Sequence, residues 1–214
     1  MLHKQYSGEE LTEILKARLL SPDGVSIKVE DILIDSRLFI RSVRTLFFAL
    51  KGVRNDGHKY IHNLYRKGIR FFVISDKDFP VSELEEASFF VVTDTLKALQ
   101  QLAAHHRSLF DIPVVGITGS NGKTIVKEWL FQLMSADRKI VRSPKSYNSQ
   151  IGVPLSVWQM NRRHELAIFE AGISRPEEMA NLQTVISPHL VFLPILAKPT
   201  AKDLSAWHKK WAKS

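Results

Sequence analysis

The sequence predicts two successive α/β units, the second of which contains a parallel sheet. Its 214 residues are 44% hydrophobic and 24% charged, which suffices for one large or two small globular domains. The segment Asp111–Pro113 interrupts a helical pattern. Beyond this segment apolar strand patterns alternate with helical patterns, which is typical of a parallel α/β sheet. We therefore expect one domain at residues 1–109 and another at residues 110–193.

The first unit begins with a helix signal. Ser7 and Glu10 form a capping box, and apolar residues at helical spacing follow from Leu11 to Leu19. Gly68 ends a second helical pattern. Short apolar runs indicate the strands. We expect strands at residues 25–29, 32–34, 46–50, 71–74 and 89–92, and further helices at residues 58–67 and 95–110.

In the second unit each apolar strand pattern is followed by a helical one. Strands are expected at residues 114–118, 140–142, 166–169 and 190–193, and helices at residues 122–134, 151–160 and 176–184. Helices of this length between strands return the chain to the same end of the sheet, so the strands are expected to be parallel.

Composition excludes several classes of protein. The chain has no cysteine, which removes disulfides and thiol chemistry. No apolar run approaches the ~20 residues that span a bilayer, and the N-terminus lacks the pattern of a signal peptide. We therefore expect a cytoplasmic protein without a membrane span. The formal charge is +8, but residues 194–214 contain five lysines and one aspartate, about half of the excess. This uneven distribution disfavours a dedicated nucleic-acid-binding protein.

A phosphate-binding loop is predicted where the strand at residues 114–118 meets the next helix. Glycines allow tight folding around an anion, and backbone N–H groups at a helix N-terminus bind phosphate. Lys123 would reach the β- and γ-phosphates of a nucleotide, and the Thr124 hydroxyl would bind magnesium. Ile117 stands where a general P-loop has glycine, which favours a shorter variant. The predicted nucleotide-binding residues are Gly119, Ser120, Asn121, Gly122, Lys123 and Thr124.

The run Thr118–Thr124 resembles the ATP loop of the Mur ligases and of their folylpolyglutamate synthetase relatives. Other segments are similar to one branch of that family. Asp35–Arg37, with Leu46–Gly52 and Asp56–His58, resembles the N-terminal domain that binds the UDP-sugar end of the substrate. Two more segments resemble parts of the ATP domain, namely Tyr147–Leu155 and Phe169–Ser174. The sequence Glu-Ala-Gly-Ile-Ser in the last of these segments is similar to that of family members fused to an alanine racemase.

The resemblance implies a Mur-type UDP-substrate domain followed by an incomplete ATP-binding domain. It implies ATP and Mg²⁺ as cofactors and D-alanyl-D-alanine and UDP-N-acetylmuramoyl-tripeptide as substrates in peptidoglycan synthesis. The ligation would proceed through an acyl phosphate. The residues it assigns fall into three groups: catalytic Lys123, Glu170 and Asn148; metal-binding Thr124 and Glu170; and substrate-binding Ser36, Arg37, Phe48, Asn148 and Ser149.

Simpler interpretations compete with these roles. Glu170 could be a solvated carboxylate at a strand end, Asn148 a turn residue, and Arg37 one half of a surface ion pair. Asp56 and Gly57 could form only a turn. At the level of the whole chain, the alternatives are a UDP-sugar-binding remnant without catalysis, or another Mur-type or folylpolyglutamate-type ligase.

Residues 194–214 depart from the family pattern. After Leu193 the resemblance leads us to expect Thr-Asn-Ile-Gly-x-Ala-His, whereas the chain continues Pro-Ile-Leu-Ala-Lys-Pro-Thr. This run can be encoded by codons that give the expected motif when the same DNA is read in a shifted frame. We therefore hypothesise an out-of-frame tail, and expect this chain to lack ligase activity alone. The coding DNA tests the idea, which is wrong if its codons around Leu193 do not yield Asn-Ile-Gly in that frame.

Overall fold

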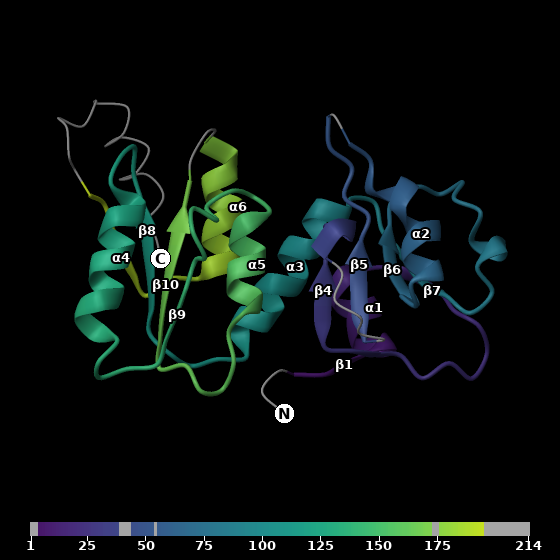
Figure 1. Cartoon of the computed structure of the whole chain (residues 1–214), viewed down its shortest axis with the longest axis horizontal. Helices are drawn as coiled ribbons and strands as arrows, with labels where there is room; N and C mark the ends of the chain where they lie inside the picture. Colours follow the sequence, from purple (N-terminus) through teal and green to yellow (C-terminus); the bar gives the residue numbers. More distant parts are fainter. Residues whose placement is uncertain (1–3, 39–43, 54, 173–175, 195–214) are drawn as a thin grey trace. The chain divides into compact units, whose positions relative to one another are not determined.

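The structure is a computed structural model that describes residues 4–38, 44–53, 55–172 and 176–194 (Figure 1). The chain divides into two compact units, unit one at residues 1–105 and unit two at residues 106–214. The division falls a few residues before the predicted boundary at 109/110, inside helix α3 (Thr95–Ser108). The hypothesised out-of-frame tail lies outside the described residues, apart from Pro194.

Unit one contains a five-stranded sheet in the order β2-β7-β6-β5-β4. Strands β4 to β7 are parallel to one another, and β2 is antiparallel to β7. A two-stranded pair, β1 with β3, lies outside this sheet. The strands are β1 (Tyr6–Ser7), β2 (Arg18–Leu20), β3 (Lys28–Val29), β4 (Asp31–Leu33), β5 (Thr45–Phe48), β6 (Phe71–Ile74) and β7 (Ser88–Val91). The other helices are α1 (Gly8–Leu15) and α2 (Ile61–Arg66), with 3-10 turns at Ser36–Leu38, Gly57–Tyr60 and Val81–Glu83.

The central strands of unit one are buried because helices or loops cover both faces of a parallel sheet. All four residues of β5 and of β6 are buried. On one face Phe72 stacks on Phe89 with ring centroids 5.4 Å apart, and Phe47 meets Phe72 edge-on at 6.3 Å. These continuous apolar runs explain why the central strands could be predicted closely.

The first helix ends earlier than predicted. Lys16 adopts the left-handed conformation, with φ at 50°, and its N–H bonds back to the Thr12 and Glu13 carbonyls. This C-cap stops α1 at Leu15, so Leu19 belongs to strand β2 and not to the helix. The predicted capping box of Ser7 and Glu10 is confirmed.

Unit two contains a four-stranded parallel sheet in the order β11-β8-β10-β9. Helix α4 covers one face of this sheet, and α5 and α6 lie on the other (Figure 1). The strands are β8 (Val114–Thr118), β9 (Ile140–Arg142), β10 (Leu166–Ala171) and β11 (Leu190–Phe192). The helices are α4 (Lys123–Met134), α5 (Gly152–Trp158) and α6 (Pro176–Ile186). The predicted parallel sheet is confirmed.

The two histidines at the end of α3 belong to different units. His106 is buried, and its Nε2 lies 3.0 Å from the Met160 carbonyl in unit two. In unit one, the ring of His105 meets Tyr6 edge-on. Among the described residues no group of three or more His, Cys, Asp or Glu side chains is placed to hold a metal ion.

Candidate functional site

The predicted phosphate loop connects the carboxyl end of β8 to the first turn of α4. Gly119 has φ at 136° and Gly122 has φ at 78°, conformations that side chains with a Cβ rarely adopt. Gly122 is the N-cap of α4, and within the described part of the chain no side chain caps this helix. The first N–H groups of α4 therefore remain available to an anion, as at other helix N-termini that bind phosphate.

Lys123 folds back over this loop. Its Nζ donates to the Gly119 carbonyl at 2.5 Å, so the ammonium lies above the turn and not out in solvent. Ser120 and Asn121 form the exposed tip of the loop. The six residues predicted to bind nucleotide thus form a turn followed directly by the first two residues of α4, with a positive charge and the helix N-terminus on the same segment.

Thr124 and Glu170 meet beside the loop. The Thr124 Oγ1 donates to Glu170 Oε2 at 3.1 Å, although the two residues come from α4 and β10. The pairing of β10 with β8 places Ala171 opposite Thr118, so Glu170 lies at the same sheet edge as the loop. Ligands of open α/β sheets bind at this edge. Glu170 is wholly buried, with an exposed fraction of 0%, which rules out a solvated strand-end carboxylate.

These two oxygens fit a magnesium ion. Mg²⁺ prefers hard oxygen ligands in an octahedron with bonds of about 2.0–2.1 Å, so adjacent ligands lie about 2.9 Å apart. The separation of 3.1 Å between Thr124 Oγ1 and Glu170 Oε2 is close to that value. A protein site with one carboxylate is ordinary for Mg²⁺, which takes its other ligands from water and substrate phosphates. Thr124 and Glu170 would hold the ion.

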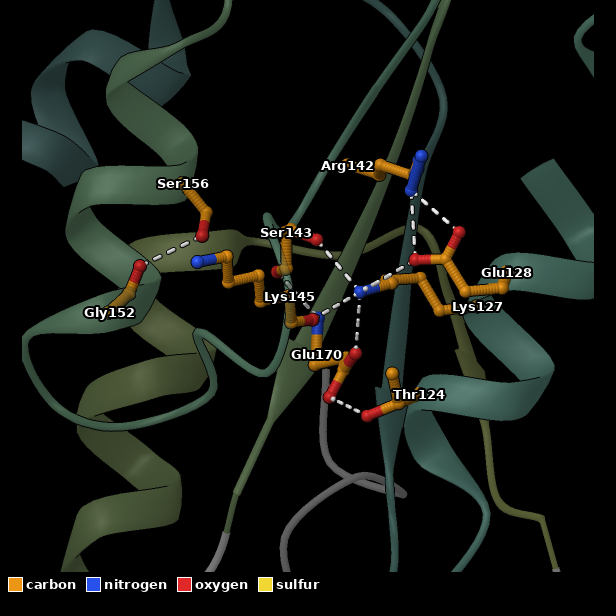
Figure 2. Close-up of polar contacts among 9 residues, drawn as sticks. All are labelled: Thr124, Lys127, Glu128, Arg142, Ser143, Lys145, Gly152, Ser156 and Glu170. Carbon is orange, nitrogen blue, oxygen red and sulfur yellow. Dashed lines mark hydrogen bonds and ion pairs between the residues drawn. The ribbon is translucent and has the colours of Figure 1, made fainter.

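Lys127 is a member of the site that the sequence did not reveal. It lies on α4 one turn beyond Thr124, is wholly buried, and places its Nζ 2.9 Å from Glu170 Oε1 (Figure 2). This ion pair is the contact of Glu170 Oε1, which accepts no hydrogen bond from the described residues. The signal in the sequence was its spacing, because residues three apart share a helix face. A lysine three positions after Thr124 therefore shares the face turned toward Glu170.

Asn148 and Ser149 belong to the loop between β9 and α5. The Asn148 carbonyl accepts the Gly172 N–H at 2.7 Å, two residues beyond Glu170. A Cβ on Gly172 would lie 3.0 Å from the Asn148 Oδ1 and carbonyl oxygens, so the bare glycine permits this close approach. Ser149 Oγ accepts the Gly152 N–H at the start of α5. The structure therefore places Asn148 against Gly172, two residues beyond Glu170, and gives Ser149 a local structural bond.

In unit one, Ser36 and Arg37 lie in the 3-10 turn after β4. The Arg37 guanidinium pairs with Asp35 at 2.6 Å and remains 86% exposed. Hydrogen bonds from the Arg37 side chain and backbone lower the pKa of Asp35 to about 2. This is the surface ion pair considered above, and it leaves much of the guanidinium accessible to a ligand.

The prediction for Phe48 needs correction. Its side chain is 0% exposed in the core of the unit-one sheet, so it cannot offer a side-chain surface to substrate. The resemblance of Leu46–Gly52 to the UDP-sugar domain led to this assignment, but the apolar residues of β5 are explained by burial in a central strand.

The segment at residues 56–58 joins two loops at the carboxyl edge of the same sheet. His58 Nδ1 lies 2.6 Å from Asp56 Oδ1, and its Nε2 accepts the N–H groups of Ser75 and Asp76 after β6. Burial raises the pKa of Asp56, but hydrogen bonds from His58 outweigh it, so the pKa of that carboxyl falls below its usual value. Asp56 caps the turn that begins at Gly57, which supports a structural role.

Comparison with known proteins gives consistent results. Residues 29–107 match the model described as Mur ligase family, catalytic domain, and residues 117–197 match the Mur ligase middle domain. The UDP-N-acetylmuramoyl-tripeptide–D-alanyl-D-alanine ligase of Treponema pallidum is 35% identical over 80% of this chain. A crystal structure of MurF from Acinetobacter baumannii superposes with a TM-score of 0.78 at 25% identity over 90% of the chain. MurF from Thermotoga maritima, crystallised with ADP, gives a TM-score of 0.63 at 28% identity over 76%.

The chain spans about two fifths of the length of these relatives: 37% of the Treponema protein, 41% of the Acinetobacter chain and 37% of the Thermotoga chain. In the described ranges we find no helix with the length and apolar character that a bilayer crossing requires.

Proposed function

Because this chain belongs to the Mur ligase family, we propose that it provides the ATP site and the UDP-sugar site of a peptidoglycan precursor ligase. The ligase would join D-alanyl-D-alanine to UDP-N-acetylmuramoyl-tripeptide. The observation that supports this most is the contact between Thr124 and Glu170 beside an uncapped helix N-terminus. A phosphate-binding turn next to a metal-binding oxygen pair is the arrangement that phosphoryl transfer needs.

The chain's own residues would act by positioning and by charge. The N–H groups of the Gly119–Gly122 turn would hold the β- and γ-phosphates. Lys123 would exchange its bond to the Gly119 carbonyl for a phosphate oxygen, since a charged acceptor binds an ammonium more strongly than a neutral one. A substrate carboxylate would then attack the γ-phosphorus of ATP and release ADP, giving an acyl phosphate, and the incoming amine would attack the acyl carbon and displace inorganic phosphate.

We propose that Thr124 Oγ1 and Glu170 Oε2 hold Mg²⁺. The bound ion would neutralise charge on the triphosphate during transfer. Asn148 lies beside Gly172 at the same edge and would contact the reacting groups from the β10 side. Glu170 is buried and paired, so it would bind the ion without first losing a shell of bulk water.

In unit one we propose that Ser36 and Arg37 contact the UDP-sugar. Arg37 is exposed and permanently charged, which suits a diphosphate. Asp35 already orients the guanidinium by hydrogen bonds to Nε and Nη2. ATP and UDP-linked precursors are cytoplasmic compounds, so we also propose a cytoplasmic location.

Two calorimetric titrations of the full chain test this function. We expect one ATP site per chain that is tightened by Mg²⁺ and weakened by Lys123→Met, and a separate site for UDP-N-acetylmuramoyl-tripeptide that is weakened by Arg37→Ala. Binding of the UDP-sugar without ATP would instead support the non-catalytic remnant. Binding of neither ligand would refute both. Phosphate release with both substrates and ATP would contradict the expectation that this chain alone lacks ligase activity.

A further inference from the structure

We propose that Lys127 is a positioning residue that presents a single oxygen of Glu170 to the magnesium ion and joins that carboxylate to the loop carrying Asn148. The inference rests on the proposed function, because it assumes that Glu170 binds the metal. It adds a residue and a geometry that the phosphate loop itself does not contain.

The ammonium of Lys127 has three partners, which come from two segments distant in the chain, the β9–α5 loop and β10. Its Nζ donates to the carbonyls of Ser143 and Lys145, at 2.8 and 2.5 Å, and pairs with Glu170 Oε1 at 2.9 Å (Figure 2). The side chain is 0% exposed. A buried ammonium is costly unless it is paired and hydrogen-bonded, so these two hydrogen bonds and one ion pair hold α4, the β9–α5 loop and β10 in one geometry.

Glu128 does not take over this role from Glu170. Its carboxylate lies 3.2 Å from Lys127 Nζ but only 2.7 Å from Arg142, which contacts both of its oxygens. The Glu128 side chain is also 35% exposed. A shorter, two-oxygen pair with Arg142 already satisfies Glu128, so the buried charge of Lys127 has the buried Glu170 as its matching partner.

The two oxygens of Glu170 therefore have separate partners. Lys127 holds Oε1, while Oε2 faces the Thr124 hydroxyl. A carboxylate with one oxygen committed to an ammonium binds a metal through the other oxygen alone. Monodentate binding suits the small octahedral Mg²⁺, whereas a two-oxygen carboxylate is common for the larger Ca²⁺.

The same ammonium holds the loop that carries Asn148. Lys145 adopts a left-handed conformation, with φ at 49°, and its carbonyl points to Lys127 Nζ. Ser143 Oγ accepts the Glu170 N–H at 3.0 Å, and the Asn148 carbonyl accepts the Gly172 N–H. Loss of the ammonium would leave two carbonyls and one carboxylate oxygen unpaired. Both the metal ligand and Asn148 would then lose their fixed positions.

The first test measures ATP affinity of the full chain by calorimetry, with and without Mg²⁺. Groups that orient metal ligands usually change metal affinity by about 10–100-fold. We expect the factor by which Mg²⁺ tightens ATP binding to be at least about tenfold smaller in Lys127→Met than in wild type. The affinity for ATP without Mg²⁺ should stay within about twofold of wild type. Leu182→Ala, which removes buried volume from α6 on the face of the sheet opposite to α4, is the matched control for destabilisation (Figure 1). It should keep the full Mg²⁺ gain.

The second test needs no nucleotide. Amide hydrogen exchange at Glu170 and Gly172 should be at least about tenfold faster in Lys127→Met than in Leu182→Ala when both are compared at equal distance below their melting temperatures. If Lys127→Met does not fold, Lys127→Gln is measured in the same way, because glutamine offers N–H donors without the positive charge. Wild type that binds no ATP would refute the proposed function, and the exchange rates would still decide the positioning role. Unchanged exchange, an unchanged Mg²⁺ gain, or a larger Mg²⁺ gain in Lys127→Met would overturn the proposal.

Discussion

Replacement of Thr124 by valine removes one hydroxyl and keeps the branched shape of the side chain. In the structure this hydroxyl donates to Glu170 Oε2 at 3.1 Å, and the carboxylate is wholly buried. A hydrogen bond to a charged group contributes about 1.5–3 kcal/mol, but Thr124 is partly exposed and water can replace some of it, so we expect a loss of about 1 kcal/mol. For a unit of this size that loss lowers the melting temperature by about 4–8 °C.

The matched variant is Thr124→Ser, which keeps the hydroxyl and loses the methyl group. We expect Thr124→Ser to retain most of the factor by which Mg²⁺ raises ATP affinity. In Thr124→Val this factor should be smaller by about tenfold or more, equivalent to about 1.4 kcal/mol. Differential scanning calorimetry measures the first effect and isothermal titration the second. Equal Mg²⁺ dependence in the valine and serine variants would refute the assignment of Thr124 as a metal ligand.

Three further predictions concern unit one. Gly57→Ala would place a Cβ 2.8 Å from backbone atoms of Ala49 and Leu50, so thermal unfolding should show a loss of about 1–3 kcal/mol; an unchanged melting temperature would contradict the packing described. Arg37→Ala should return the pKa of Asp35 from about 2 toward 3.8, as followed by carboxyl NMR shifts, and a pKa that stays near 2 would argue against the ion pair. Burial, with help from the charge of Lys4, lowers the pKa of His105 below 6.5, so the unfolded chain binds more protons and stability should fall as the pH drops below about 6.5. Urea unfolding at pH 7 and pH 5 should show a smaller pH effect in His105→Gln, and an equal effect would exclude His105 as the cause.

The largely buried central strands of the two parallel sheets are among the parts of the fold that the sequence predicted closely. Strands β6 and β8 were predicted with the bounds they have, because a central strand of a parallel sheet is apolar along its whole length. Strand β2 was missed because its residues continue the apolar spacing of α1, and the left-handed Lys16 that separates them has no strong signature in a single sequence.

The candidate site also has parts that the sequence predicted and parts that it did not. The turn at Gly119–Gly122 and the start of α4 could be predicted because glycine, lysine and threonine each have a local reason to be there. Lys127 was missed because its role depends on carbonyls of the β9–α5 loop and on β10, which are distant in the chain. Phe48 was misassigned because an apolar residue in a recognisable segment has the same appearance whether it contacts substrate or the core.

A crystal structure of this chain with ADP and Mg²⁺ is the most direct test of the central claim. We predict the β-phosphate in the Gly119–Thr124 turn beside Lys123, and the ion about 2.0–2.1 Å from both Thr124 Oγ1 and Glu170 Oε2. Glu170 Oε1 should remain paired with Lys127. Nucleotide bound away from the turn, or an ion that Glu170 does not touch, would contradict the account.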